Sequence, residues 1–256
     1  MDALERRAIV TRMDKRRDIA KAVIEFMGEA IAETLWPTRC ALCDCPGDVL
    51  CEHCLRQLPF LDQWRACKRC GAPYGLVQCT ECNPVKLAHL ERDTLPFAWC
   101  ASATMFDHSS TGRLVRVYKD QGEQRLAEIM ARLMVQALTP SWSFEAVSFV
   151  PATLAAYRHR GYDHAQLLAQ HIACLVGLPV IPLLARPTTS DQRALGRSQR
   201  VANLQGRFCA LDAVQAPQRL LLVDDVFTTG ATLCAATDAL LSCGVKTVGC
   251  LTFARV

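Results

Sequence analysis

Apolar residues recur along this chain in two rhythms, which from about residue 98 onward predict alternating strands and helices. Short continuous apolar runs between turn residues predict buried strands, and runs with a period near 3.6 predict amphipathic helices. The predicted strands cover residues 101–106, 146–150, 220–223 and 247–253. The predicted helices cover residues 111–118, 125–138, 163–176 and 231–243, the last closed by Gly244. Buried strands separated by helices indicate an α/β fold with a parallel sheet, whose ligands bind at the carboxyl ends of the strands.

Three regions depart from this pattern. Residues 1–35 predict a helix with one apolar face, which either packs on the body as a plain extension or binds a partner. Residues 186–208 have no clear period and predict a long arginine-rich loop, a length that is usually functional or mobile. Residues 38–84 contain the cysteine pairs and few long apolar runs. We therefore expect a helical extension at 1–35, a cysteine-rich module at 36–90 and an α/β domain at 98–256.

The most informative segment is LLLVDDVFTTGAT, residues 220–232. Four apolar residues lead directly into Asp224 and Asp225, and two threonines and Gly230 then precede a predicted helix. Two adjacent carboxylates at a strand end repel each other unless a cation or ligand lies between them. Backbone N–H groups at a helix start bind phosphate, and a glycine lets that backbone approach closely. The segment predicts a site for the hydroxyls and phosphate of a sugar; the alternative is an ordinary strand–turn–helix with solvated aspartate caps.

The cysteines predict metal sites. Nine of the 15 cysteines lie between residues 40 and 82, and eight of these form four C-x₂-C pairs. One such pair places two thiolates on one ion, and two pairs complete a tetrahedral Cys₄ site. We expect two structural zinc ions with sequential ligand sets, or interleaved ones as the alternative: Cys40, Cys43, Cys51 and Cys54, then Cys67, Cys70, Cys79 and Cys82. Cys45 is interpreted as a spectator, and small core residues are expected at Cys100, Cys174, Cys209, Cys234, Cys243 and Cys250.

Composition and charge narrow the class of protein. A chain of 256 residues that is 51% hydrophobic can bury one substantial core and carry a small appended module. Charged residues throughout the first 34 positions argue against a signal peptide, and no apolar run approaches the roughly 20 residues that span a bilayer. We therefore expect a cytoplasmic protein, in which paired thiols bind metal more often than they form disulfides. Eight zinc-bound thiolates would offset the formal charge of +4, so a global basic field is no argument for nucleic acid.

The 220–232 segment closely resembles the 5-phosphoribosyl-1-pyrophosphate (PRPP) binding motif of type I phosphoribosyltransferases. The resemblance implies that Asp224 and Asp225 are catalytic residues that engage the ribose hydroxyls and the associated Mg²⁺. It also implies a set of residues that wrap the 5′-phosphate: Thr228, Thr229, Gly230, Ala231 and Thr232.

Three further segments and the cysteine module resemble the ComF-like phosphoribosyltransferase proteins over about residues 36–256. The first is LVRVYKDQG, in which Lys119 either reaches a phosphate or is an ordinary C-terminal helix charge. The second is Val150-Pro151, interpreted as the start of a pyrophosphate loop, followed by RHRGYDHA, where the family has Arg-Gly-Phe-Asn. The third is the arginine-bearing loop that contains Arg197.

The arginines favour a ligand rich in phosphate. Residues 151–208 contain seven arginines, no lysine and two aspartates. Guanidinium groups match the geometry of phosphate oxygens, so Arg160 and Arg197 are candidate catalytic residues, with a solvated surface loop as the alternative. His159, His164 and His171 are explained as well by helix faces as by catalysis, because no nucleophile accompanies them.

The sequence therefore predicts an α/β fold of the type I phosphoribosyltransferase kind, with a parallel sheet and a small N-terminal zinc-ribbon module. The leading hypothesis is a protein that binds PRPP with Mg²⁺ and transfers phosphoribosyl to an unknown acceptor. No residue identifies a base for that acceptor, so turnover is left open. The resemblance also implies a link to DNA uptake and natural transformation. The alternatives are a non-catalytic accessory protein that binds single-stranded DNA and a regulator that senses PRPP.

Overall fold

The computed structural model describes residues 37–139, 141–187, 208–211 and 216–256. The predicted helix at 1–35, and most of the predicted arginine-rich loop with Arg197, lie outside the described residues. The chain divides into two compact units, residues 1–51 and 52–256. The boundary between them falls inside the first group of cysteine pairs.

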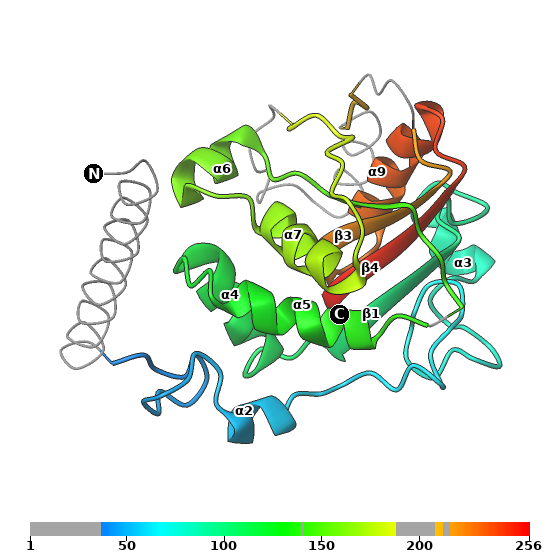
Figure 1. The fold of residues 1–256 in the computed structure, drawn as a ribbon. Coiled ribbons are helices and arrows are strands. Elements are labelled where there is room, and N and C mark those ends of the chain that lie inside the picture. The colour runs from blue at the N-terminus through cyan, green and yellow to red at the C-terminus, as the bar shows by residue number, and fades with distance from the viewer. Residues whose placement is uncertain (1–36, 140, 188–207, 212–215) are drawn as a thin grey trace, which may run out of the picture. The chain divides into compact units, whose positions relative to one another are not determined.

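The second unit is built around a four-stranded parallel sheet with the strand order β1-β4-β3-β2 (Figure 1). The strands are β1 (Trp99–Met105), β2 (Ala146–Phe149), β3 (Arg219–Phe227) and β4 (Thr247–Arg255). β3 and β4 are central, and almost all of their residues are buried, because side chains on both faces are covered. This double burial explains the continuous apolar runs in the sequence. The parallel α/β fold is confirmed, and all four strands fall where they were predicted.

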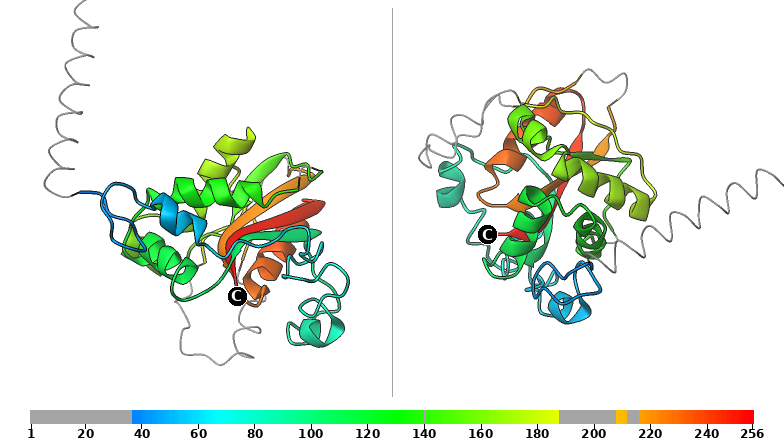
Figure 2. Two further views of the ribbon diagram at one scale, coloured as in Figure 1. Left: turned by 90° about the horizontal axis from the view of Figure 1, so that it is seen from below. Right: turned by 90° about the vertical axis from the view of Figure 1, so that its left-hand side faces the viewer.

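Helices cover both faces of the sheet. On one face, α5 (Leu126–Gln136) packs against α7 (His164–Val176), and on the opposite face lies α9 (Ala231–Ser242) (Figure 2). The remaining helices are α2 (Glu52–Arg56), α3 (Pro84–Ala88), α4 (Thr111–Asp120) and α6 (Leu154–Arg160). α6 was not predicted, because its seven residues include no buried side chain and so show no apolar period. It is nevertheless closed at both ends, since the Thr153 side chain accepts from the Ala156 N–H and Gly161 adopts φ +79°.

β3 extends four residues beyond its predicted end at Val223, and this extension positions the aspartates. Pairing between β3 and β2 stops at Phe149 opposite Val223, whereas pairing with β4 continues to Arg255 opposite Phe227. Asp224 and Asp225 are therefore held by β4 on one side, and on the other side they lie beyond the end of β2. The acidic pair sits at the carboxyl end of the sheet, as the motif predicted, but inside the strand rather than after it.

Residues 64–82, which contain the second group of cysteine pairs and are called the second cysteine segment, pack into the same core as the sheet. Cys67 and Cys70 are buried with Phe97, from the chain before β1, and with Leu233 of α9. Gly71 adopts φ +74°, and a Cβ at this position would lie 2.5 Å from the Cys100 carbonyl oxygen of β1. Only glycine permits this approach, so the segment is seated directly on the sheet backbone.

Three of the six cysteines that were predicted to be core residues are buried. Cys100, Cys234 and Cys250 are buried core residues as predicted. The prediction was wrong for Cys174 and Cys209, which are exposed, and for Cys243, which is half-buried. Among the described residues, no helix has both the length and the apolar character needed to cross a membrane.

Candidate functional site

The centre of the site is the carboxylate pair at the end of β3. Both side chains are buried, with Asp224 8% and Asp225 3% exposed. The Lys119 Nζ lies 2.7 Å from Asp225 Oδ2, and the His164 Nε2 lies 3.7 Å from Asp225 Oδ1. Burial opposes ionisation of Asp225, but Lys119 and then His164 outweigh it and hold the pKa of Asp225 well below its usual range. Burial, together with the neighbouring charge of Asp225, raises the pKa of Asp224 well above its usual range.

Lys119 supplies the cation that two adjacent carboxylates require. It lies in the last turn of α4, and burial, which lowers its pKa, is outweighed by Asp225 and Asp224, which raise it. The sequence left Lys119 open between a phosphate contact and an ordinary helix charge. In the structure its ammonium group faces Asp225, and the phosphate contact stays a prediction.

The same carboxylates could also hold a divalent ion. One ligand atom from each of His164, Asp224 and Asp225 lies within 4.8 Å of the others. Carboxylate oxygens suit Mg²⁺, which is bound in many phosphate sites through one or two carboxylates and the phosphates of the substrate. The donor set therefore fits the Mg²⁺ that the sequence predicts beside the sugar.

The loop after β2, which begins at Val150-Pro151, is held in place by the buried carboxylate of Asp163. Asp163 Oδ2 accepts hydrogen bonds from the Ala152 N–H at 2.9 Å and from Arg186 Nη1 at 2.6 Å. Asp163 Oδ1 accepts from two N–H groups at the start of α7, so one carboxylate joins the loop to the helix. The Arg186 guanidinium also stacks 4.2 Å from the ring centroid of Tyr157.

Arg160 approaches the carboxylate pair through His164. Arg160 lies at the end of α6 with a side chain 11% exposed, and its Nη1 is 3.4 Å from His164 Nδ1. The backbone carbonyl of His164 accepts a hydrogen bond of 2.6 Å from the hydroxyl of the fully buried Tyr118. The sequence left His164 open between a helix face and a catalytic role, and in the structure it lies beside Asp225. The available signal was its place directly after the helix cap Asp163, in the segment that carries Arg160.

The predicted phosphate-binding segment, residues 228–232, begins directly after β3 and runs into the start of α9. Gly230 is the N-cap of α9 with φ +79°, a conformation that side chains rarely adopt. A Cβ on Gly230 would also lie 2.7 Å from Cζ of Phe227, so the backbone here runs directly over the Phe227 ring. The exposed Thr228 and Thr229 precede it, and Thr229 Oγ1 accepts from the Ala231 N–H at 3.4 Å. The segment, with Thr232, thus presents hydroxyls and backbone donors at a helix start.

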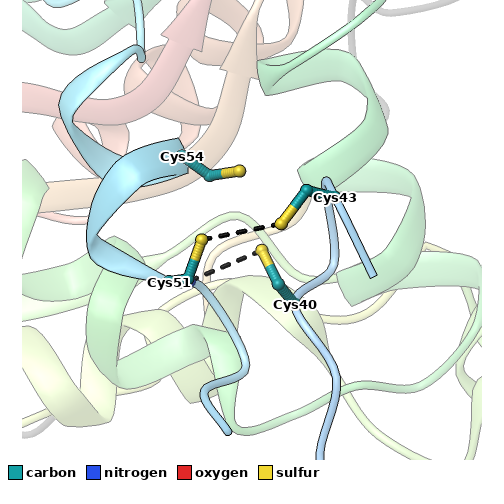
Figure 3. Close-up of side chains that lie close together, drawn as sticks. All are labelled: Cys40, Cys43, Cys51 and Cys54. Carbon is teal, nitrogen blue, oxygen red and sulfur yellow. Dashed lines mark hydrogen bonds between the residues drawn. The ribbon is translucent and has the colours of Figure 1, made fainter. Parts of the chain in front are cut away.

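The cysteine pairs assemble into two tetrads in sequential order. In the first, Cys43 Sγ lies 3.6 Å from Cys51 Sγ, and the Cys51 N–H donates to Cys40 Sγ at 3.4 Å; Cys54 completes the group (Figure 3). In the second, the closest sulfur pairs are Cys67–Cys82 at 3.7 Å and Cys70–Cys79 at 3.5 Å. Within each tetrad all four sulfurs lie within 4.8 Å of one another. Both tetrads could therefore hold a zinc ion with four protein ligands, which is the arrangement of a structural site.

Comparison with known proteins agrees with this geometry. The family model of the phosphoribosyl transferase domain matches residues 196–256, which include β3, α9 and β4. Competence protein ComFC of Streptococcus pneumoniae is 23% identical over 199 residues, which cover 74% of this chain and 87% of the relative. Competence protein F of Haemophilus influenzae is 29% identical over 145 residues, 53% of this chain and 63% of the relative. The DNA utilization protein YhgH of Salmonella typhi is 26% identical over 227 residues, 83% of this chain and 94% of the relative.

The parallel sheet, the acidic strand end and the helix-start phosphate segment together define a protein of the type I phosphoribosyltransferase fold. Two cysteine tetrads precede this domain along the chain. The chain is similar to the two competence proteins and to YhgH over 53–83% of its length.

The tetrads predict the zinc content. Purified protein should contain about two zinc ions per chain by elemental analysis. Cys43→Ser and Cys79→Ser should each leave about one, because each removes a ligand from a different tetrad. Cys45→Ser is the matched control and should retain both ions, since Cys45 belongs to neither tetrad. Folded wild-type protein without zinc would contradict both sites.

The carboxylate pair predicts opposite effects of two isosteric substitutions on the ligand-free protein. Asp225→Asn should lower the free energy of unfolding by about 2 kcal/mol, because Lys119 loses its charged partner. Asp224→Asn should raise it by about 1 kcal/mol, because it removes the repelled member of the pair. The folded-state pKa of Asp224 is raised, so the wild-type protein loses stability from this group as pH rises above about 4.

Urea unfolding at several pH values measures both effects. The gain from Asp224→Asn should grow as pH rises above about 4, because asparagine does not titrate, whereas the carboxyl of Asp224 ionises in the unfolded wild-type chain before it ionises in the folded protein. A gain that does not change with pH, or a loss at neutral pH, would show that Asp224 is not repelled by Asp225.

Proposed function

We propose that this protein binds PRPP together with Mg²⁺ at the carboxyl end of β3. The observation that carries the proposal is the buried Asp224-Asp225 pair, followed within the same segment by the glycine-capped start of α9. A carboxylate pair suits the two ribose hydroxyls, and a helix start with backbone and hydroxyl donors suits the 5′-phosphate.

Each part of the site has a role in this proposal. Asp224 and Asp225 orient the ribose, and residues 228–232 hold the 5′-phosphate. The loop at Val150-Pro151, fixed by Asp163, and the guanidinium of Arg160 face the pyrophosphate. Mg²⁺, when bound, neutralises charge on the pyrophosphate. Arg197 remains a predicted contributor from the arginine-rich segment.

Transfer of the phosphoribosyl group is a further part of the proposal. A nucleophilic nitrogen of an acceptor would form a bond to the anomeric carbon, and the bond from that carbon to pyrophosphate would break. The names of the ComF relatives also support a role in DNA uptake or use. The protein would then couple the chemistry of a ribose phosphate to the handling of incoming DNA.

Calorimetry with PRPP and Mg²⁺ tests the binding site. Wild-type protein should bind, and the double variant Asp224→Asn/Asp225→Asn should lose at least about 100-fold in affinity, or about 2.7 kcal/mol. The exposed Asp93 provides a control, because Asp93→Asn removes one negative charge outside the site, as each of the two substitutions does within it. No heat with the wild-type protein would overturn the proposal. A screen for pyrophosphate release across candidate bases then separates an enzyme from a PRPP sensor.

The second cysteine segment supports a second candidate function, the binding of single-stranded DNA. Trp64 is 84% and Tyr74 75% exposed, and the two lie on neighbouring stretches joined by a hydrogen bond from the Leu76 N–H to the Arg65 carbonyl. Exposed aromatic rings stack on bases of any sequence, and the nearby exposed Lys68 adds a phosphate contact. The same segment would hold DNA while the sheet holds PRPP.

Fluorescence anisotropy with a labelled oligothymidine tests this function. Affinity should fall steeply with salt concentration, as expected for contacts with phosphates. Trp64→Ala and Tyr74→Ala should each weaken binding by about 1–3 kcal/mol through lost stacking. Trp142→Phe is the control, since the Trp142 ring is already stacked on Trp99 of β1, with 3.6 Å between the ring centroids. An affinity that changes neither with salt concentration nor in Trp64→Ala would contradict a DNA-binding surface on this segment.

A further inference from the structure

Arg255 is a buried cation that has no carboxylate partner within the described part of the chain. It is the last residue of β4 and only 2% exposed, and no carboxylate among the described residues forms an ion pair with it. Burying an unpaired guanidinium is costly, so a negative group is expected nearby. The polar groups that Arg255 meets belong to the second cysteine tetrad. Its Nη1 donates to the Cys70 carbonyl at 2.7 Å, and its Nη2 lies 4.0 Å from Cys70 Sγ.

A zinc ion would make this tetrad the counter-charge for Arg255. Four thiolates with one Zn²⁺ carry two net negative charges, which a neighbouring guanidinium partly balances. Four sulfurs within 4.8 Å of one another suit the ion, and the buried guanidinium beside them suits the charge of the complex. The residues present therefore fit zinc on two separate observations.

The same guanidinium also contacts Phe227, the last residue of β3, which directly precedes the predicted phosphate-binding segment. The Arg255 Cζ is 3.9 Å from the ring centroid of Phe227, a cation–π contact with a buried ring. The backbone of Gly230 runs over that ring so closely that a Cβ would lie 2.7 Å from Phe227 Cζ. Phe227 thus contacts both the Arg255 guanidinium and Gly230, the N-cap of α9.

We propose that Arg255 is a positioning residue that couples zinc occupancy of the second tetrad to the geometry of the phosphate-binding segment. A planar guanidinium can donate to the Cys70 carbonyl and lie flat on Phe227 at once, which an ammonium group cannot. Loss of zinc would release Cys70 and with it Arg255, and the ring under Gly230 would lose its support. The effect on PRPP affinity rests on the proposed function, whereas the coupling itself does not.

Hydrogen exchange of the full-length protein tests the coupling without any ligand. In Arg255→Met, amides of residues 227–232 should exchange at least about tenfold faster, while α7 keeps its wild-type protection. Cys79→Ser, which removes zinc from the second tetrad, should produce the same increase. Cys43→Ser, the matched change in the first tetrad, should produce none. The double variant Arg255→Met/Cys79→Ser should exceed neither single variant, because both act on one route.

Two further variants distinguish the loss of the Arg255 contacts from a general loss of stability in this part of the protein. Arg92 pairs with Asp238 of α9 and so also ties the cysteine-rich part of the chain to the helix that follows the phosphate segment. Arg92→Met should leave the exchange of residues 227–232 unchanged. Arg255→Lys keeps the charge but not the two contacts, so it should retain about two zinc ions and still show faster exchange.

The outcomes are decisive in both directions. Wild-type exchange in Arg255→Met, an equal increase in Arg92→Met, or additive increases in the double variant would each overturn the coupling. Calorimetry on the same proteins adds the functional result, with PRPP affinity about tenfold lower in Arg255→Lys. If wild-type protein does not bind PRPP, the proposed function fails while the exchange data still decide the role of Arg255.

Discussion

The ion pair between Lys119 and Asp225 is the interaction on which the arrangement of the site depends. Two carboxylates buried side by side at a strand end would cost several kcal/mol without a positive group. Lys119 reaches them from the last turn of α4, and His164 reaches them from the first turn of α7. The pair therefore fixes two helices, and the loops before them, around the end of β3. Lys119 thus gives the buried pair a positive partner from within the protein.

The sequence revealed those parts of the site that lie within one local segment. The apolar run before Asp224, the glycine of the phosphate segment and the cysteine spacings each report a local geometry, and the fold followed from them. His164, Asp163 and Arg255 could not be assigned in this way, because their partners are distant along the chain. Asp163 meets Arg186 23 positions later, and Arg255 meets Cys70 185 positions earlier. Only the tertiary fold shows that these groups touch.

The difference between local pattern and distant contacts also explains where the predicted elements and core cysteines were wrong. The apolar pattern of β3 stops at Val223, where polar residues begin, but the strand continues because β4 still pairs with it. α6 carries no apolar period, yet caps at both ends are sufficient to form it. Cys174 and Cys209 are apolar enough to suggest burial, but each faces outward, since helix and loop positions do not follow hydropathy alone.

The second cysteine segment and the sheet form one physical unit rather than two domains joined by a linker. The segment contributes buried residues to the core beneath α9, and Gly71 places its backbone against β1 without an intervening side chain. In a metal site of this kind, the free energy of zinc binding is part of the free energy of folding. Phe227 belongs to that shared core and also contacts Gly230, so zinc bound to the second tetrad would stabilise the core on which the predicted phosphate-binding segment rests. A module that holds metal can thus shape a site for an anion without contacting it.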